Sequence, residues 1–373
     1  VRAAVREIGY PVLIRPSYVL GGRGMEILSS NRQLDAYMQD AFLSPERPLL
    51  VDEYLGNAIE LDVDAVCDGN EVLIGAIMEH LEEAGIHSGD STCFIPPQTI
   101  SQSIISEVEK WTRIIGLELG IVGCFNIQFA IRDETLYVLE VNPRGSRTFP
   151  FVAKATGVPL ARIAARLALG EKLVDMSVPE PQTEAVCVKA PVFPFIKLRG
   201  LDPAPGPEMK STGEVMGSHE RASAAYLKAR LATESPVPTE GGVYITVKDA
   251  DKHAIIEQAR ELAELGFQLY ATRGTSQILR DEGGLDVQTC YRITERKTPD
   301  ALDLMRQGKI HLIINTPRNT GGAVLDGNMM RRLAVELNIP FVTTMAGARM
   351  EVLAIGEMRL GIPEPRLLTI GSI

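Results

Sequence analysis

The sequence is poor in the residues that build disulfide frameworks and zinc centres. It has five cysteines, an odd number, and none of them forms a C-x-x-C pair. Its five histidines are equally dispersed along the chain. This usage argues against a disulfide-stabilised fold and against a zinc site, and it predicts a protein of the reducing cytoplasm.

Basic residues are outnumbered by acidic ones, 38 against 48, and the net charge is −10. Because nucleic-acid binding relies on basic surfaces that neutralise phosphates, we expect no nucleic-acid partner. The sequence has no apolar run as long as a membrane span, so we expect no membrane partner either. A local basic pocket for one small phosphate is still compatible with this charge.

The length of 373 residues predicts two or three domains, and 45% hydrophobic with 23% charged residues is typical of globular ones. A cluster of prolines and glycines over 233–242 marks the clearest break. We therefore predict a first domain over 1–232, a linker over 233–242 and a second domain over 243–373. The chain starts without Met in a pattern typical of the middle of a helix, which indicates a piece of a longer polypeptide.

The second domain alternates strand and helix patterns, which predicts a doubly wound parallel sheet of the α/β class. Ligands of such sheets bind beyond the carboxyl ends of the strands. Thr272 and Thr275 stand at one such end, before a predicted helix, where hydroxyl and N–H groups suit an anion. Lys252 can complete the charge. Plain N-capping by Thr272 is an equally open alternative.

The strongest candidate site in the first domain is a predicted hairpin of strands 126–129 and 139–144. Residues two apart on a strand share a face, so Glu140 and Asn142 point the same way. If 133–135 form the turn, four oxygen-bearing side chains gather on one face. The pairs predicted by this turn are residue 132 with 136, Gln128 with Glu140, and Asn126 with Asn142.

Carboxylate and amide oxygens are ligands for Mg²⁺, and the neighbouring Arg144 suits phosphate oxygens. The hairpin is therefore a candidate site for a metal-bound phosphate. The alternative, which the pattern by itself favours, is the solvated outer face of an ordinary antiparallel hairpin.

Three further stretches of the first domain carry patterns that could belong to a site. A glycine-rich loop over 21–24 follows a predicted strand that ends in Arg15, but it matches neither the P-loop nor the dinucleotide fingerprint, and an ordinary glycine hairpin is the alternative. Residues 59–65 alternate strictly, which predicts a strand with one apolar and one acidic face. The polar loop over 79–91 has two histidines seven apart, a spacing that matches no standard metal motif.

Taken together, these motifs resemble the C-terminal part of the carbamoyl-phosphate synthetase large chain. The resemblance covers essentially the whole chain. The sequence strings that carry it are residues 10–25, 78–91, 139–147, 150–160 and 206–217, and the last two of these strings are long and specific.

The resemblance implies a partial α+β ATP-grasp unit over 1–232, with its N-terminal portion missing, and a methylglyoxal-synthase-like allosteric domain over 243–373. It implies that the first unit uses ATP and Mg²⁺ (or Mn²⁺) to phosphorylate carbamate. That step is the second half-reaction of glutamine-dependent carbamoyl-phosphate synthesis, which feeds arginine and pyrimidine biosynthesis. The implied partners are the rest of the large chain, a glutaminase small chain and a nucleotide effector such as UMP or IMP.

Residue-by-residue matching with the family implies the roles of individual side chains and favours the functional interpretation of the hairpin. The implied metal ligands are Gln128, Glu140 and Asn142, and the implied catalytic residues are Arg15 and Arg144. The implied nucleotide-binding residues are Arg15, Glu53, Leu55, Glu60, Gly85, Ile86, His87, Ser88, Gln128 and Glu140. The implied effector-binding residues are Lys252, Thr272, Thr275, Arg292, Asn315 and Thr316.

The sequence departs from the family at two places. Ala190 stands where the enteric enzymes have an acid of the ornithine site, so we expect no ornithine activation, although Glu82 and Asp90 can still contribute. Gly321 and Gly322 are not followed by the acid that methylglyoxal synthase requires, so we do not expect that activity.

The sequence is compatible with two alternative functions. The chain can be a catalytically incompetent fragment that acts only as an effector-binding regulatory module. It can also be another ATP-grasp ligase, such as a biotin carboxylase or a purine-pathway ligase, which would explain the metal set but not the string over 206–217.

Overall fold

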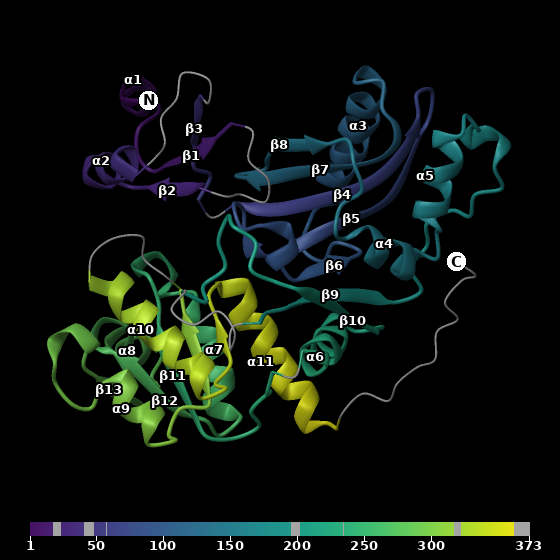
Figure 1. The fold of residues 1–373 in the computed structure, drawn as a ribbon. Helices are drawn as coiled ribbons and strands as arrows, with labels where there is room; N and C mark the ends of the chain where they lie inside the picture. The colour runs from purple at the N-terminus through teal and green to yellow at the C-terminus, as the bar shows by residue number, and fades with distance from the viewer. Residues whose placement is uncertain are drawn as a thin grey trace.

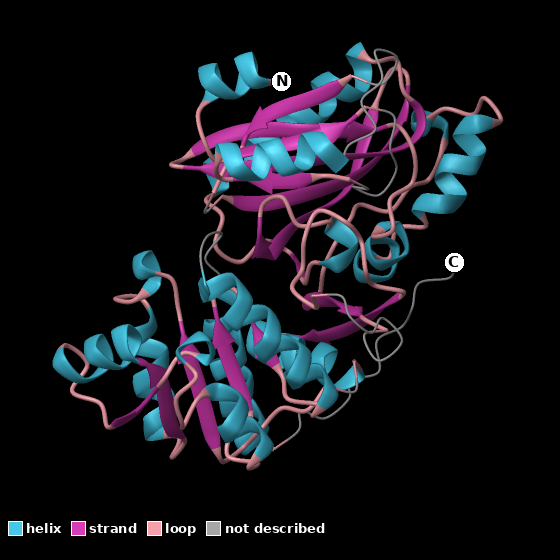
Figure 2. Ribbon diagram, turned by 60° about the vertical axis from the view of Figure 1, so that its left-hand side comes forward, coloured by secondary structure: helices cyan, strands magenta, loops and turns pink. Residues whose placement is uncertain are grey.

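The computed structural model describes residues 1–17, 24–40, 48–56, 58–194, 202–233, 235–316 and 322–361. The described residues form three sheets (Figure 1). Two antiparallel sheets lie in the upper part of that view, and a parallel sheet surrounded by helices lies below them (Figures 1 and 2). In this described part, no helix is both long and apolar enough to cross a bilayer.

The first sheet is small and antiparallel, with the strand order β2-β1-β3. Its core joins apolar residues of β1 and β2 to Val5 of α1 and to Leu34 and Tyr37 of α2. Most of the glycine-rich loop predicted over 21–24 lies outside the described residues; only Gly24 is described. The elements are α1 (Arg2–Ile8), β1 (Val12–Pro16), β2 (Glu26–Leu28), α2 (Asn31–Asp40) and β3 (Leu49–Glu53).

The second sheet has seven antiparallel strands in the order β10-β9-β6-β5-β4-β7-β8. Helix α3 packs on one face, and α4 and α5 pack on the other. The elements are β4 (Ile59–Asp68), β5 (Val72–Glu83), β6 (Cys93–Ile95), α3 (Gln102–Glu118), β7 (Val122–Arg132), β8 (Thr135–Asn142), α4 (Phe149–Thr156), α5 (Leu160–Ala168), β9 (Val186–Val192) and β10 (Gly213–His219).

The third sheet is fully parallel, with the order β13-β12-β11-β14-β15. Helices α7, α8 and α11 pack on one face and α9 and α10 on the other, which confirms the predicted doubly wound sheet. The elements are β11 (Gly242–Thr246), α7 (Ile255–Glu264), β12 (Gln268–Thr272), α8 (Arg273–Asp281), β13 (Val287–Cys290), α9 (Ala301–Arg306), β14 (Leu312–Asn315), α10 (Gly322–Glu336), β15 (Phe341–Val342) and α11 (Met345–Arg359).

Helix α6 (Ala222–Ala232) joins the seven-stranded sheet to the parallel-sheet region. Its buried residues belong to one apolar cluster that also includes Val188 of β9 and Val352 of α11. Glu351 of α11 accepts hydrogen bonds from the Tyr226 hydroxyl at 2.8 Å and from the Arg230 guanidinium at 3.1 Å. Apolar burial and a buried ion pair therefore hold the two regions against each other.

Candidate functional site

The hairpin of β7 and β8 has the predicted polar pairs, but its turn and its register differ from the predicted ones. The turn has two residues, Asp133 and Glu134, both with positive φ, and Arg132 pairs with Thr135 rather than with residue 136. Between Phe129 and Gln128 the register then shifts by one residue. That bulge places Gln128 opposite Glu140 and Asn126 opposite Asn142, as predicted.

Three oxygen-bearing side chains of this hairpin are open to solvent at least in part: Gln128, Glu140 and Asn142. The Asn142 amide donates to Glu140 Oε1 at 2.7 Å, and Arg144 Nη2 donates to Asn142 Oδ1 at 3.4 Å. The donor set consists of one carboxylate and two amides beside a guanidinium. Such a set fits a divalent cation that is shared with phosphate oxygens.

Asn126 is a correction to the predicted group of four oxygens. It is buried, and its amide donates to Asp64 Oδ1 at 3.0 Å instead of facing the open side of the hairpin. Asp64 Oδ2 accepts from the hydroxyls of Ser146 at 2.8 Å and Thr148 at 2.7 Å. Burial raises the pKa of Asp64, and these hydrogen bonds oppose the rise. Asn126 thus has a structural role: with the two hydroxyls, it fixes the segment after Arg144 to β4.

The acidic face of β4 is present as predicted, but it is buried rather than solvated. Glu60 accepts a hydrogen bond from the Gly85 amide at 3.1 Å. His80 of β5 lies between the acids, with Nδ1 at 3.7 Å from Glu60 and Nε2 at 3.7 Å from Asp62. Burial raises the pKa of Asp62 to about 8 and lowers the pKa of His80 to about 3, so the imidazole is neutral at physiological pH.

These three residues can hold a cation. Glu60, Asp62 and His80 each offer one ligand atom, and the three atoms lie within 4.8 Å of one another. The polar atoms of Asp62 and His80 are buried without a hydrogen-bond partner of normal geometry. Lys189 of β9, fully buried, supplies a positive charge that lowers the pKa of Asp62, and its ammonium donates to the Ser88 carbonyl at 2.9 Å.

The predicted nucleotide segment, Gly85 to Ser88, follows the end of β5, and its first two residues, Gly85 and Ile86, line a cavity of about 530 Å³. Tyr54, between the predicted residues Glu53 and Leu55, lines the same cavity, and burial raises its pKa to about 12. The His87 amide donates to the Gly206 carbonyl at 2.9 Å. Arg15 lies on β1 of the small sheet, and its Nε donates to Asp52 at 3.0 Å.

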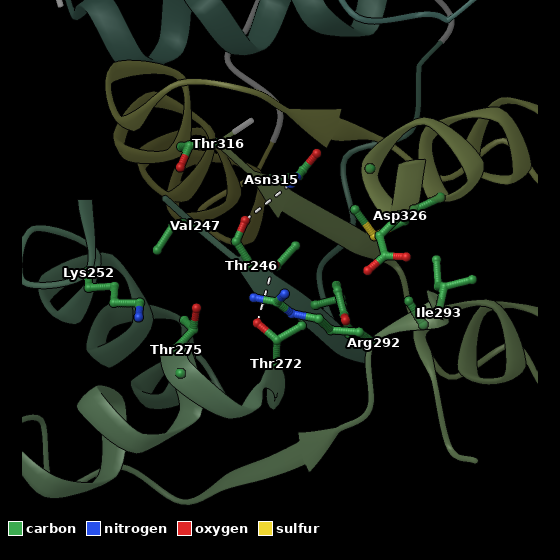
Figure 3. A pocket seen from close by; sticks show the side chains of 15 residues that line it. Thr246, Val247, Lys252, Thr272, Thr275, Arg292, Ile293, Asn315, Thr316 and Asp326 are labelled. Atoms are coloured by element: carbon green, nitrogen blue, oxygen red, sulfur yellow. Dashed lines mark hydrogen bonds between the residues drawn. The ribbon is translucent and has the colours of Figure 1, made fainter. Parts of the chain in front are cut away.

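A second candidate site lies at the carboxyl ends of the parallel strands. All six predicted effector residues line one cavity of about 70 Å³: Lys252, Thr272, Thr275, Arg292, Asn315 and Thr316. Figure 3 shows Lys252 approaching from the side of Thr275, while Arg292 reaches toward Thr272 from the other side.

The chemistry of this pocket suits an anion. Thr272 occupies the N-cap position of α8, but its side chain makes no capping hydrogen bond. Its hydroxyl lies 3.3 Å from the Thr246 hydroxyl instead, which argues against the capping alternative. The N-terminal N–H groups of α8 therefore have no side-chain cap, and Lys252 and Arg292 add positive charge beside them.

Two family models match the chain. Residues 1–176 match the carbamoyl-phosphate synthase L chain ATP-binding domain, and residues 254–343 match the MGS-like domain. The chain is 52% identical over 365 residues to the carbamoyl phosphate synthase large chain of Methanothermobacter thermautotrophicus, covering 96% of this chain and 34% of that one. The chain belongs to the carbamoyl phosphate synthase large-chain family.

The match falls in the C-terminal part of the large chain. A relative from Methanocaldococcus jannaschii, named carbamoyl phosphate synthase large chain, C-terminal section, is 49% identical over 368 residues, with 95% of this chain and 59% of that one covered. The chain thus spans about a third of the full-length large chain from Methanothermobacter thermautotrophicus.

A solved structure shares part of the fold. It is the biotin carboxylase domain of the Hydrogenobacter thermophilus 2-oxoglutarate carboxylase, in complex with MgADP, ADP and bicarbonate. The TM-score is 0.50 with 20% sequence identity, and 63% of this chain and 58% of that chain are covered. Together with the family models, this similarity confirms the predicted α/β fold class with an ATP-grasp unit.

The sequence analysis missed some residues of both candidate sites of this chain. In the pocket at the carboxyl ends of the parallel strands it missed Asp326, Gly327 and Met330 of α10, although one helical face brings all three to the end of β14. In the first site it missed Lys189 as the buried counter-charge. No local signal identifies Lys189, because its acidic neighbours are far away in sequence.

Proposed function

We propose that this chain binds MgATP beside the β7–β8 hairpin and phosphorylates carbamate to carbamoyl phosphate. The proposal rests on one observation above all: Gln128, Glu140 and Asn142 present oxygens on one face, with Arg144 immediately beyond them. Held by these oxygens, Mg²⁺ (or Mn²⁺) would neutralise charge on the phosphoryl group during its transfer.

The chain's own residues have distinct tasks in this proposal. Arg15 and Arg144 contact the phosphates and the developing carbamoyl phosphate. Glu53, Leu55, Glu60 and the segment 85–88 hold the nucleoside, and the cavity that Gly85 and Ile86 line together with Tyr54 receives it. Excluding water from this cleft protects carbamate, which is short-lived in water.

The fold neighbour supports the choice of substrate. Its structure contains MgADP together with bicarbonate, and carbamate differs from bicarbonate only by an amino group in place of a hydroxyl. In the full enzyme we assign this step to the second half-reaction of glutamine-dependent synthesis, for arginine and pyrimidine biosynthesis in the cytoplasm. The rest of the large chain and a glutaminase small chain are the proposed partners.

The test of this proposal is ATP formation from carbamoyl phosphate and MgADP by the chain itself. This reverse reaction needs the phosphoryl-transfer site but neither glutamine nor the first half-reaction. It also separates an active unit from a fragment that serves only for regulation.

The C-terminal pocket supports a second proposed function, the binding of a nucleotide monophosphate such as UMP or IMP. Lys252, Arg292 and the uncapped start of α8 suit its phosphate. The hydroxyls of Thr272 and Thr275 can bind its phosphate oxygens or its ribose.

Replacing Thr272 with alanine is expected to weaken UMP or IMP binding about fivefold, the effect of losing one hydrogen bond worth about 1 kcal/mol. Titration calorimetry measures this effect directly. Thr289→Ala is the matched control, because this threonine is on the neighbouring strand β13 and hydrogen-bonds Ser276 outside the pocket. Equal affinity of wild type and Thr272→Ala would remove Thr272 from the proposed site.

A further inference from the structure

The segment over 202–211 contacts the proposed nucleotide segment and Asp90, two residues after it. The Gly206 carbonyl accepts from the His87 amide at 2.9 Å. The carboxylate of Asp90 accepts from the backbone amides of Lys210 at 2.8 Å and Ser211 at 2.9 Å. This segment includes the start of the sequence string over 206–217, to which no role has been given.

The same segment also holds the small sheet. Glu208 Oε1 accepts a hydrogen bond from the Gly24 amide at 2.8 Å. The carbonyl of Gly24 accepts in turn from the Tyr37 hydroxyl of α2 at 2.8 Å. Glu208 therefore links the seven-stranded sheet region to the unit that carries Arg15.

On its other side the segment reaches the effector pocket. Asp202 forms a two-point ion pair with Arg331 of α10, at 2.9 Å to Nε and 2.6 Å to Nη2. The third nitrogen of Arg331 donates to Asn315 Oδ1 at 2.6 Å, and Asn315 lines the pocket. Arg331 is buried, and the ammonium of Lys210 closes the segment on itself by donating to the Asp202 carbonyl at 3.0 Å.

The guanidinium of Arg331 packs closely against the backbone of Gly327. A Cβ placed on Gly327 would lie 2.8 Å from Arg331 Nη1 and 3.3 Å from Asn315 Oδ1. Gly327 itself lines the pocket. A ligand that moves Asn315 or the first part of α10 must therefore move Arg331, and with it Asp202.

A second connection starts from the next residue of the same strand end. The Thr316 hydroxyl accepts from the Lys248 amide at 2.9 Å, and the Lys248 ammonium lies 3.0 Å from Glu83 Oε1. Glu83 ends β5, two residues before Gly85. The two connections thus reach the proposed nucleotide segment from its two ends.

We propose that the segment over 202–211 transmits occupancy of the C-terminal pocket to the nucleotide cleft, with the Arg331–Asp202 ion pair as its first link. Gly206 and Glu208 are its last links, to the nucleotide segment and to the small sheet. Asp202 is a positioning residue, because it lines neither cavity and acts through Arg331. The inference rests on the proposed function of both sites and adds their regulation.

The experiment measures the coupling between two ligands in the 373-residue chain. Titration calorimetry gives the dissociation constant of MgADP with and without saturating UMP, and that of UMP with and without MgADP. Because coupling is reciprocal, the two ratios must agree. We expect wild type to show a ratio of about fivefold or more, and Asp202→Ala to bring both ratios to within about twofold of one, with each ligand alone binding as before.

Glu357→Ala is the matched control. Glu357 of α11 forms the same two-point pair with Arg221, at 2.9 Å and 2.6 Å, and also bridges the two regions, but it lines neither cavity. We expect this variant to keep the wild-type coupling. Full coupling in Asp202→Ala, equal loss in Glu357→Ala, or no coupling in wild type would each overturn the relay while leaving both sites in place. A wild-type chain that binds neither ligand would instead overturn the proposed function, and the relay with it.

Discussion

Glu140→Ala is expected to abolish ATP formation from carbamoyl phosphate and MgADP, with a loss on the order of 100-fold or more. Glu140 is the carboxylate of the hairpin's oxygen set, between the amides of Gln128 and Asn142. Without it, the proposed site loses the negative charge that would hold a divalent cation against the phosphates. A coupled assay that detects newly formed ATP measures the effect.

Glu118→Ala controls for the loss of one acidic side chain. Glu118 is exposed at the end of α3, which packs on the opposite face of the sheet from the hairpin's polar residues. We expect the Glu118→Ala variant to form ATP at the wild-type rate. Activity in Glu140→Ala close to wild type would contradict the proposed site. A folded wild-type chain that binds MgADP but forms no ATP would contradict the claim that this chain contains a sufficient site.

Gly217→Ala is expected to destabilise the chain by about 3 kcal/mol or more, because its side chain has no space. Gly217 is on β10, where α6 packs against the strand. An added Cβ would lie 2.2 Å from the Ala225 carbonyl oxygen and 2.5 Å from the Ala229 amide nitrogen, both of them backbone atoms of α6. Because these are backbone atoms of a helix, no side-chain rotation can relieve the clash, and α6 and β10 must move apart.

Gly213→Ala is the control on the same strand. Its Cβ would meet only Val192 Cβ, at 3.9 Å, which is an ordinary contact. Urea unfolding followed by circular dichroism compares the two variants. Equal stability of Gly217→Ala and Gly213→Ala would show that the close approach of α6 does not limit this position.

Local patterns were sufficient to predict the pieces of the fold that depend on neighbours in sequence. The period of two in β4 gave its acidic face, and the regular alternation of strands and helices gave the parallel sheet with its pocket at the carboxyl ends. The same period placed Glu140 and Asn142 on one face, but the pairing of Gln128 with Glu140 was predicted from a three-residue turn that the structure does not have.

What could not be predicted depends on residues far apart in the chain. The two-residue turn and the bulge offset each other, and no pattern in β8 marks the bulge. The pattern of β4 does not show that its acidic face is buried, and the buried counter-charge, Lys189, is more than 120 residues away. Asp202 and Arg331 are 129 residues apart, so no spacing rule connects them.

The cluster around α6 limits how members of this family can be recombined. A chimera cut within 233–242 would take α6 from one parent and α11 from the other, through the middle of a shared apolar cluster. Tyr226 and Arg230 would then face a foreign helix in place of Glu351. An exchange of the parallel-sheet region between relatives should therefore keep α6 and α11 from the same parent.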